Sequence, residues 1–253
     1  MDKGTIKLLC KQFNVDEDTI DFVNSREVFI KDKFQEIDKI KEYNQYKILS
    51  SMQDTRLSAT DFNWTTGYGY GDIGRDKVEE IYSLIFNGED SLVRPTIASG
   101  THAITLCLSG LLGPGDEFIS ITDSPYDTLQ KVIGAKGREE GTLLEYGIKY
   151  KEVPLKNGEI DTREVINNIS EKTKLLLIQR STGYSHRKAI TIDEMEIAIK
   201  KIREIHRDII IMVDNCYGEF VEKKEPLDIG ADIIAGSLIK NPGGGLALSG
   251  GYI

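Results

Sequence analysis

The sequence predicts an α/β protein in which a mostly parallel sheet follows an N-terminal helical segment. Short runs rich in Val, Ile and Leu recur along the chain after its first third. Such runs are typical of strands that are buried on both faces of a parallel sheet. Helical patterns lie between them. This alternation predicts parallel strands joined by right-handed crossovers, with ligands bound at the carboxyl ends of the strands.

The first part of the chain, residues 1–60, differs in composition from the rest. It is rich in Lys, Asp, Glu and Gln and contains no proline. Ile30, Phe34 and Ile37 recur at helical spacing among charged residues, which predicts one or two amphipathic helices. These helices could pack on their own domain or on a partner subunit. We therefore predict a helical segment over 1–60 and a second domain over 61–253.

The second domain is predicted to alternate strands and helices. Five apolar runs are predicted strands: residues 96–99, 117–122, 175–179, 209–214 and 232–236. Two stretches between them are predicted helices: residues 101–112 and 192–206. The second helix begins with Thr191 and Glu194 at the spacing of a capping box. Gly-Pro-Gly at 113–115 ends the first helix.

The last residues, LALSGGYI, predict one strand, a glycine turn and the beginning of another strand. An unpaired apolar strand end is a liability for a folded protein. We therefore expect this sequence to be the front part of a longer protein.

Composition narrows the classes of function. The chain has 253 residues, 40% of them hydrophobic and 29% charged, with a net charge of −9. An acidic total argues against nucleic acid or an anionic membrane as the main partner. The cysteines, Cys10, Cys107 and Cys216, are far apart in the chain and odd in number, which fits a reduced cytoplasmic protein. The sequence shows neither a membrane-sized apolar run nor a signal peptide, so a cytoplasmic enzyme is expected.

Three predicted strand ends carry groups that could bind a ligand. Ser99, Gly100 and Thr101 open a helix, where small residues can surround an anion, although a serine there can simply cap the helix. Tyr126 follows the next strand and either places its ring at the edge of the sheet or lies half-buried in a turn. Arg180 follows another strand and could bind a carboxylate or phosphate, or be a solvated loop residue.

Two further strand ends carry charged residues. Asp214 follows a fully apolar run, so its carboxylate is expected to be buried and to need a cationic partner, unless it caps nearby backbone N–H groups. Lys240 lies between Leu238-Ile239 and a glycine run, a confined apolar setting that would favour a nucleophilic amine. A lone lysine is otherwise usually a surface charge.

Together these groups meet the needs of pyridoxal 5′-phosphate. An anion cup holds the phosphate and an aromatic ring stacks on the pyridine. An acid keeps the pyridine nitrogen protonated, and a lysine binds the cofactor as a Schiff base. The alternative, a nicotinamide cofactor, needs Gly-x-Gly-x-x-Gly directly after a strand, and the glycines from Gly67 onward do not fit that context.

Six runs of the sequence carry a family resemblance: GYGYGDIGRD, SGTHA, SPYDTLQKVIG, IQRSTGY, VDNCYGEF and GADIIAGSLIKNPGGG. They resemble the methionine γ-lyase-like family, also called aluminium resistance proteins, from about residue 45 to the end. That family is similar to the cystathionine β- and γ-lyases. The resemblance implies the aspartate-aminotransferase fold (fold type I), a three-layer sandwich around a mostly parallel sheet, and a C-terminal small domain that this sequence lacks.

The resemblance also implies roles for single residues. Lys240 would form the Schiff base and shuttle protons, Asp214 would pair with the pyridine nitrogen, and Tyr126 would stack on the ring. The phosphate would be held by a group of small residues: Ser99, Gly100, Thr101 and Ser237.

Three tyrosines and one arginine complete the implied site. Tyr217 matches the Asp-x-x-Tyr arrangement of aminotransferase relatives, where the hydroxyl meets the 3′ oxygen of the cofactor. Tyr68 or Tyr70 would reach the phosphate of a neighbouring subunit in a homodimer or homotetramer. Arg180 is the candidate for substrate binding. Ile239 departs from the family of transsulfuration lyases, which usually have Thr before the lysine, and this leaves the substrate open.

The implied function is a pyridoxal phosphate-dependent carbon–sulfur lyase that acts on a methionine- or cystathionine-type amino acid by β- or γ-elimination. An aminotransferase, or another fold type I reaction, is the alternative that Tyr217 encourages. A non-catalytic homologue that keeps the cofactor scaffold is another. A metal-dependent resistance factor lacks support, because the histidines His102, His186 and His206 and the scattered cysteines show no ligand spacing.

Overall fold

The computed structural model describes residues 1–68, 70–137 and 140–253, which form two compact units, Met1–Gln45 and Tyr46–Ile253. The first unit is helical, as predicted. Helix α1 (Lys3–Phe13) begins after Asp2, whose carboxylate accepts hydrogen bonds from the backbone N–H groups of Gly4 and Thr5. Helix α2 (Glu17–Asp54) starts in the first unit and continues into the second.

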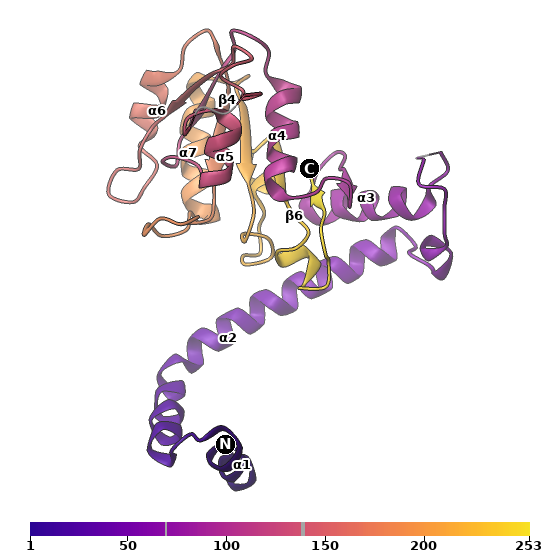
Figure 1. Cartoon of the computed structure of the whole chain (residues 1–253), viewed down its shortest axis with the longest axis vertical. Helices are drawn as coiled ribbons and strands as arrows, with labels where there is room; N and C mark the ends of the chain where they lie inside the picture. The colour runs from indigo at the N-terminus through magenta and orange to yellow at the C-terminus, as the bar shows by residue number, and fades with distance from the viewer. Residues whose placement is uncertain (69, 138–139) are drawn as a thin grey trace. The chain divides into compact units, whose positions relative to one another are not determined.

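The described residues of the second unit form a seven-stranded sheet in the order β1-β7-β6-β5-β4-β2-β3 (Figure 1). Strands β6, β5, β4, β2 and β3 are parallel, and β7 pairs antiparallel with both β6 and β1. The strands are β1 (Val93–Arg94), β2 (Glu117–Ser120), β3 (Lys149–Glu152), β4 (Thr173–Gln179), β5 (Ile210–Asp214), β6 (Ile233–Ser237) and β7 (Gly251–Tyr252). The predicted α/β fold class with a mostly parallel sheet is confirmed.

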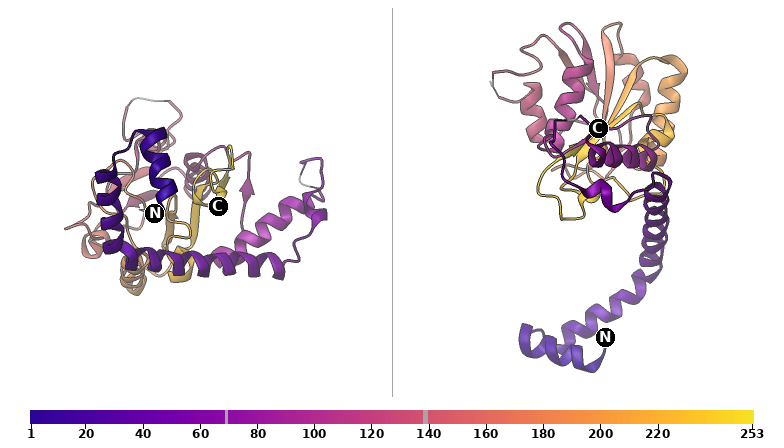
Figure 2. Two further views of the ribbon diagram at one scale, coloured as in Figure 1. Left: turned by 90° about the horizontal axis from the view of Figure 1, so that it is seen from below. Right: turned by 90° about the vertical axis from the view of Figure 1, so that its right-hand side faces the viewer.

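Helices cover both faces of the sheet. They are α3 (Ile73–Phe86), α4 (Gly100–Leu111), α5 (Asp127–Ile133), α6 (Thr162–Asn168) and α7 (Ile192–Ile205), with 3₁₀ turns at Ala59–Phe62, Pro226–Ile229 and Asn241–Gly243. Alternate residues of the central strands enter two separate cores, so that Leu175 and Leu177 pack with α4 while Leu176 and Ile178 pack with α7. Figure 2 shows the strands between α4 and α5 on one side and α7 on the other.

Three elements differ from the prediction. The strand predicted at 96–99 is wrong: β1 ends at Arg94, and the chain turns there because Pro95 has no N–H to donate and Ser99 is already the N-cap of α4. The strand predicted within LALSGGYI is also wrong at its start, since Leu246 and Leu248 are exposed and only Gly251–Tyr252 pairs. Strand β3 was not predicted, because its side chains are mostly exposed and charged.

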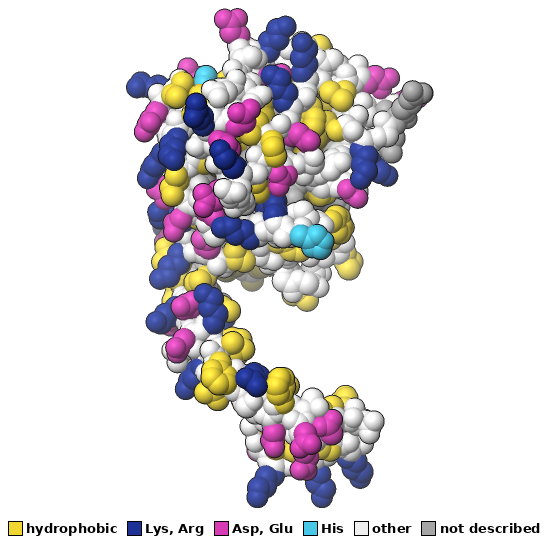
Figure 3. All heavy atoms as spheres, turned by 90° about the vertical axis from the view of Figure 1, so that its left-hand side faces the viewer, with side chains coloured by type: hydrophobic (Ala, Val, Ile, Leu, Met, Phe, Trp, Pro, Cys, Tyr) yellow, Lys and Arg dark blue, Asp and Glu magenta, His cyan; other side chains and the backbone are white. Residues whose placement is uncertain are grey.

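Charged side chains of both signs are interspersed over the face drawn in Figure 3. Within the described residues, no helix combines the length and the apolar character needed to cross a membrane.

Candidate functional site

A pocket of about 300 Å³ lies at the carboxyl ends of the parallel strands. Segments that follow β4, β5 and β6 form its walls, together with the first turns of α4 and α5. It brings together most of the residues predicted from the sequence: Ser99, Gly100, Thr101, Tyr126, Asp214, Tyr217, Ser237 and Lys240. Parallel strands end at the same edge of a sheet, so strand ends far apart in sequence meet there.

The first turn of α4 forms one wall. Ser99 is the N-cap, and its Oγ accepts a hydrogen bond from the His102 backbone N–H at 3.2 Å, so the capping role left open by the sequence is present. A Cβ atom on Gly100 would lie 3.0 Å from Cys216 Sγ and 3.3 Å from Ser237 Cβ. Glycine is therefore what allows the start of this helix to approach the ends of β5 and β6, and the positive end of the helix dipole faces the pocket.

Tyr126 is the N-cap residue of α5 and is fixed at both ends. Its hydroxyl lies 2.9 Å from Thr101 Oγ1, and its backbone N–H donates to Gln179 Oε1 at 2.9 Å. Burial raises the pKa of its phenol far above the ordinary value, so the hydroxyl stays protonated. The ring is thus held beside the start of α4.

Asp214 ends β5 and is only 2% exposed. Burial raises the pKa of its carboxyl to about 6, while the Cys216 backbone N–H, which donates to Oδ1 at 3.1 Å, and the charge of Lys240 act in the opposite direction. A buried carboxylate of this kind is stabilised by a cationic group placed against it.

Lys240 follows β6 and contacts Tyr217. Its Nζ donates a hydrogen bond to the Tyr217 hydroxyl and lies 3.8 Å from the centroid of that ring. The lysine is half-buried and its neighbour Ile239 is 49% exposed, so the prediction of an apolar enclosure made by its sequence neighbours is wrong. The lysine is instead ordered by the tyrosine ring and hydroxyl.

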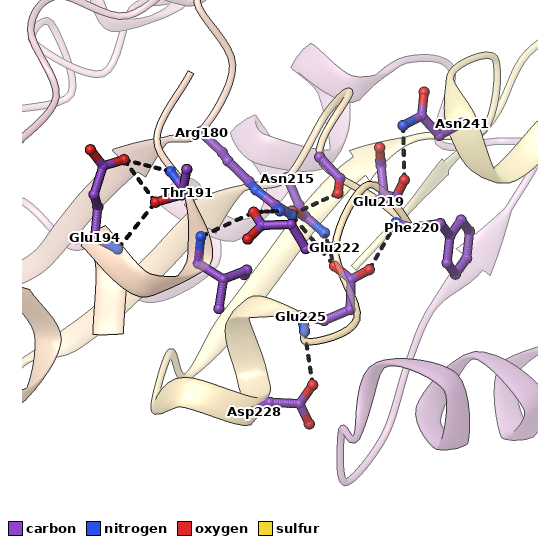
Figure 4. Close-up of polar contacts among 12 residues, drawn as sticks. Arg180, Thr191, Glu194, Asn215, Glu219, Phe220, Glu222, Glu225, Asp228 and Asn241 are labelled. Carbon is purple, nitrogen blue, oxygen red and sulfur yellow. Dashed lines mark hydrogen bonds and ion pairs between the residues drawn. The ribbon is translucent and has the colours of Figure 1, made fainter. Parts of the chain in front are cut away.

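Arg180 does not line this pocket, and it is not a solvated loop residue, which was the second alternative predicted for it. It is 2% exposed, and its guanidinium donates to Asn215 Oδ1, to the Gly218 carbonyl and to Glu222 Oε1 (Figure 4). It therefore binds carboxylates, as predicted for an arginine, but those of the chain itself. Its contact with a substrate is not supported by this geometry.

Tyr68 and Tyr70 also lie outside the pocket. Their side chains are 84% and 87% exposed in the loop that precedes α3, and residue 69 between them is outside the described residues. Their predicted role requires a second subunit and stays a prediction.

Sequence reasoning assigned no role to Gln179 and Cys216. Gln179 is buried at the end of β4, where its side chain accepts from the Tyr126 N–H and donates to the Ser181 carbonyl. Cys216 lines the pocket and donates its backbone N–H to Asp214. A polar residue that ends an apolar strand was the available signal for Gln179. Cys216 had no signal beyond its place two residues after Asp214.

The fold and the pocket define a class of protein first: an α/β domain of the pyridoxal phosphate-type lyase fold, with a buried acid and a lysine at the carboxyl edge of its sheet. Residues 19–253 match the family model described as methionine gamma-lyase, and the chain belongs to this family. The predicted family resemblance is confirmed.

Known relatives agree with this assignment. The uncharacterized protein YnbB of Bacillus subtilis is 51% identical over 221 residues, which are 87% of this chain and 52% of that protein. The structure of a protein involved in aluminum resistance from Clostridium acetobutylicum matches with a TM-score of 0.96 and 47% identity, over 100% of this chain and 60% of that one. The structure of a carbon-sulfur lyase involved in aluminum resistance from Clostridium novyi NT matches with a TM-score of 0.95 and 42% identity, over the same shares. The chain thus spans about half the length of the Bacillus subtilis protein.

Proposed function

We propose that the chain is the cofactor-binding part of a pyridoxal phosphate-dependent carbon–sulfur lyase that acts on a methionine- or cystathionine-type amino acid. The observation that carries the proposal is that Asp214 and Lys240 line one pocket with Tyr126 and the start of α4. Membership of the methionine gamma-lyase family supports the reaction class.

The residues of the pocket fit this cofactor. Gly100 lets the start of α4 lie close to Cys216 and Ser237 at the wall of the pocket. A phosphate would bind at the start of α4, where backbone N–H groups and the helix dipole favour an anion. The buried carboxylate of Asp214 suits a protonated ring nitrogen. The pocket thus offers an anion site and a cation site together.

When bound, the cofactor supplies an electron sink for the charge that develops at the α carbon of an amino acid. The chain supplies binding and proton transfer. Ser99, Thr101 and Ser237 would hold the phosphate, and Tyr126 would orient the ring. Asp214 would keep the proton on the ring nitrogen.

Lys240 would bind the cofactor and move the α proton of the substrate with its Nζ. The Tyr217 hydroxyl, which contacts that Nζ, would orient it. Elimination would break the carbon–sulfur bond and release the thiol. Water would then hydrolyse the released imine to ammonia and a 2-oxo acid.

One observation favours a second candidate. The contact between Tyr217 and Lys240 suits a transamination, in which the same lysine returns the proton at another atom. The two reactions differ in their need for a 2-oxo acid acceptor.

The test uses the purified holoprotein with methionine or cystathionine. Release of thiol and 2-oxo acid without an acceptor is the expected result, and strict dependence on an added acceptor would overturn the lyase assignment. Lys240→Ala should remove both the turnover and the visible absorption band of the bound cofactor. Lys200→Ala is the control, because Lys200 is an exposed lysine that pairs with Glu196 on α7.

We further propose that the protein works in the cytoplasm as a homodimer or homotetramer, with Tyr68 or Tyr70 completing the phosphate site of the neighbouring subunit. Sedimentation of the holoprotein tests the assembly. A mixed assembly of Lys240→Ala and Tyr68→Phe/Tyr70→Phe subunits tests the shared site, because only such a mixture should regain one intact site. No gain over the separate variants would contradict the crossing of these tyrosines.

A further inference from the structure

Arg180 is a buried arginine whose side-chain hydrogen bonds to described residues go to one loop, residues 215–225. Its Nη1 donates to Asn215 Oδ1 at 2.8 Å and to the Gly218 carbonyl at 2.7 Å, and its Nη2 donates to Glu222 Oε1 at 2.7 Å. The side chain is 3% exposed. A planar guanidinium can make these contacts together, because its donors lie on separate nitrogen atoms. A lysine ammonium has all its donors on one nitrogen.

The loop that Arg180 contacts has an unusual backbone. Tyr217 has φ 67° and Phe220 has φ 64°, in a left-handed region that residues with a side chain rarely adopt. Between them, a Cβ atom on Gly218 would lie 2.6 Å from Arg180 Nη1. The stem of the arginine thus lies directly against the loop at the bend that turns the Tyr217 ring toward Lys240. Such backbone conformations persist only where the surroundings hold them.

Acidic and amide side chains of the loop itself complete the support (Figure 4). Glu225 is fully buried, and its carboxylate accepts from the Phe220 N–H at 2.9 Å and from Asn215 Nδ2 at 3.0 Å, with Arg180 Nη1 at 3.6 Å. Glu222 also accepts from the Ile192 N–H at 3.1 Å, which ties the loop to the start of α7. Removing the arginine would take its positive charge away from the buried Glu225 carboxylate and from Glu222.

Resting on the proposed function, we propose that Arg180 is a positioning residue: it holds loop 215–225 in the bent conformation that places the Tyr217 hydroxyl on the Lys240 amine. The arginine acts from outside the pocket, through Tyr217, and touches neither cofactor nor substrate. The proton transfer proposed for Lys240 would therefore depend on how well Arg180 keeps this loop ordered.

The first test measures backbone hydrogen exchange in the cofactor-free protein. In Arg180→Lys, the amides of residues 215–225 should exchange about tenfold faster, as expected for the loss of one charge-assisted hydrogen bond. Arg203→Lys is the matched control. Arg203 likewise donates to a backbone carbonyl and to a carboxylate, but its partners, Ile209 and Asp232, lie just before β5 and β6 and not in loop 215–225. Exchange of 215–225 that stays at the wild-type rate in a folded Arg180→Lys protein would overturn the proposal.

The second test asks whether Arg180 acts through Tyr217. The absorbance of the bound cofactor is titrated with pH in wild type, Arg180→Lys, Tyr217→Phe and the double variant. Both single changes should shift the midpoint in the same direction, and Arg180→Lys should add no further shift when Tyr217 is already Phe. Additive shifts, or no shift in Arg180→Lys, would show an arginine that only stabilises the fold.

If Arg180→Lys does not fold, Glu222→Gln decides the question, because it weakens one contact of the arginine and keeps the acceptor for the Ile192 N–H. It should give a smaller shift of the same sign, and an unchanged midpoint would contradict the proposal. Exchange needs no cofactor and the titration needs no turnover. A wild-type protein that shows no elimination would therefore refute the proposed function and leave these two tests intact.

Discussion

Replacement of Asp214 by Asn should stabilise the cofactor-free protein at alkaline pH. Burial raises the pKa of the Asp214 carboxyl from 3.8 to about 6. The folded state therefore holds this proton more tightly than the unfolded state, and stability is lost as the pH rises from about 4 to about 6. A shift of this size corresponds to about 3 kcal/mol, and the full cost is present at pH 8.

Asparagine removes the ionisation and keeps the shape. Its Oδ1 can still accept from the Cys216 N–H, which donates to Asp214 at 3.1 Å. We expect Asp214→Asn to raise the free energy of unfolding of the cofactor-free protein by about 1–3 kcal/mol at pH 8, and by almost nothing near pH 4. Urea unfolding at the two pH values measures this difference. Asp208→Asn is the control, because it makes the same change of side chain at an exposed position.

The same variant should lose function. Asn cannot offer a negative charge to a protonated ring nitrogen. We therefore expect the cofactor to stabilise Asp214→Asn less than wild type, and we expect turnover to fall about 100-fold. If Asp214→Asn gains no stability at pH 8, the conclusion that burial raises the pKa of the Asp214 carboxyl is wrong. A variant that gains stability and keeps full turnover would refute the pairing with the cofactor.

Three further predictions concern residues around the site. Glu219 is fully buried, burial raises the pKa of its carboxyl to about 7, and its Oε2 has no hydrogen-bond partner among the described residues. Urea unfolding should therefore give Glu219→Gln a larger free energy of unfolding than wild type at pH 8.5. At pH 4 the two proteins should be equally stable. A Cβ atom on Gly236 would lie 2.5 Å from the ring of Tyr252, so Gly236→Ala should cost about 1–3 kcal/mol of stability in the same assay. Thr191 caps α7, and its side chain accepts a hydrogen bond from the Glu194 backbone N–H. Thr191→Ala should lower the thermal midpoint of unfolding by the equivalent of about 1 kcal/mol without changing the cofactor spectrum.

The fold was predictable wherever burial dictates the sequence. Strand β4 has Leu and Ile on both faces because both faces are covered, and the pattern is visible without coordinates. Residues 96–99 misled the prediction, because a serine that caps a helix has the same extended backbone as a strand residue. Strand β3 is exposed and charged, so its pairing with β2 leaves no apolar signature.

The site was predictable where a single rule places residues. Parallel strands end at one edge, and this rule alone brings Asp214 and Lys240 into one pocket. Arg180 lay beyond that reasoning, because its partners are 35, 38 and 42 residues further along the chain and belong to a loop with no regular structure. The role predicted for Tyr68 and Tyr70 requires a second subunit and stays a prediction, because these side chains are exposed in this chain.

On the proposed function, the burial that makes Asp214 destabilising in the cofactor-free protein would also make it favourable for binding the cofactor. The net charge of the chain is −9, so its overall field does not attract a dianionic phosphate, and binding must come from local groups. In the proposed complex, the start of α4 would offer N–H dipoles to the phosphate, and the buried Asp214 carboxylate would offer its charge to the ring cation. Because ionised Asp214 is costly only while it has no cation, a ligand that supplies one recovers that cost on binding. On the proposed function, the cofactor would bring the charge of a protonated pyridine to the buried Asp214 carboxylate.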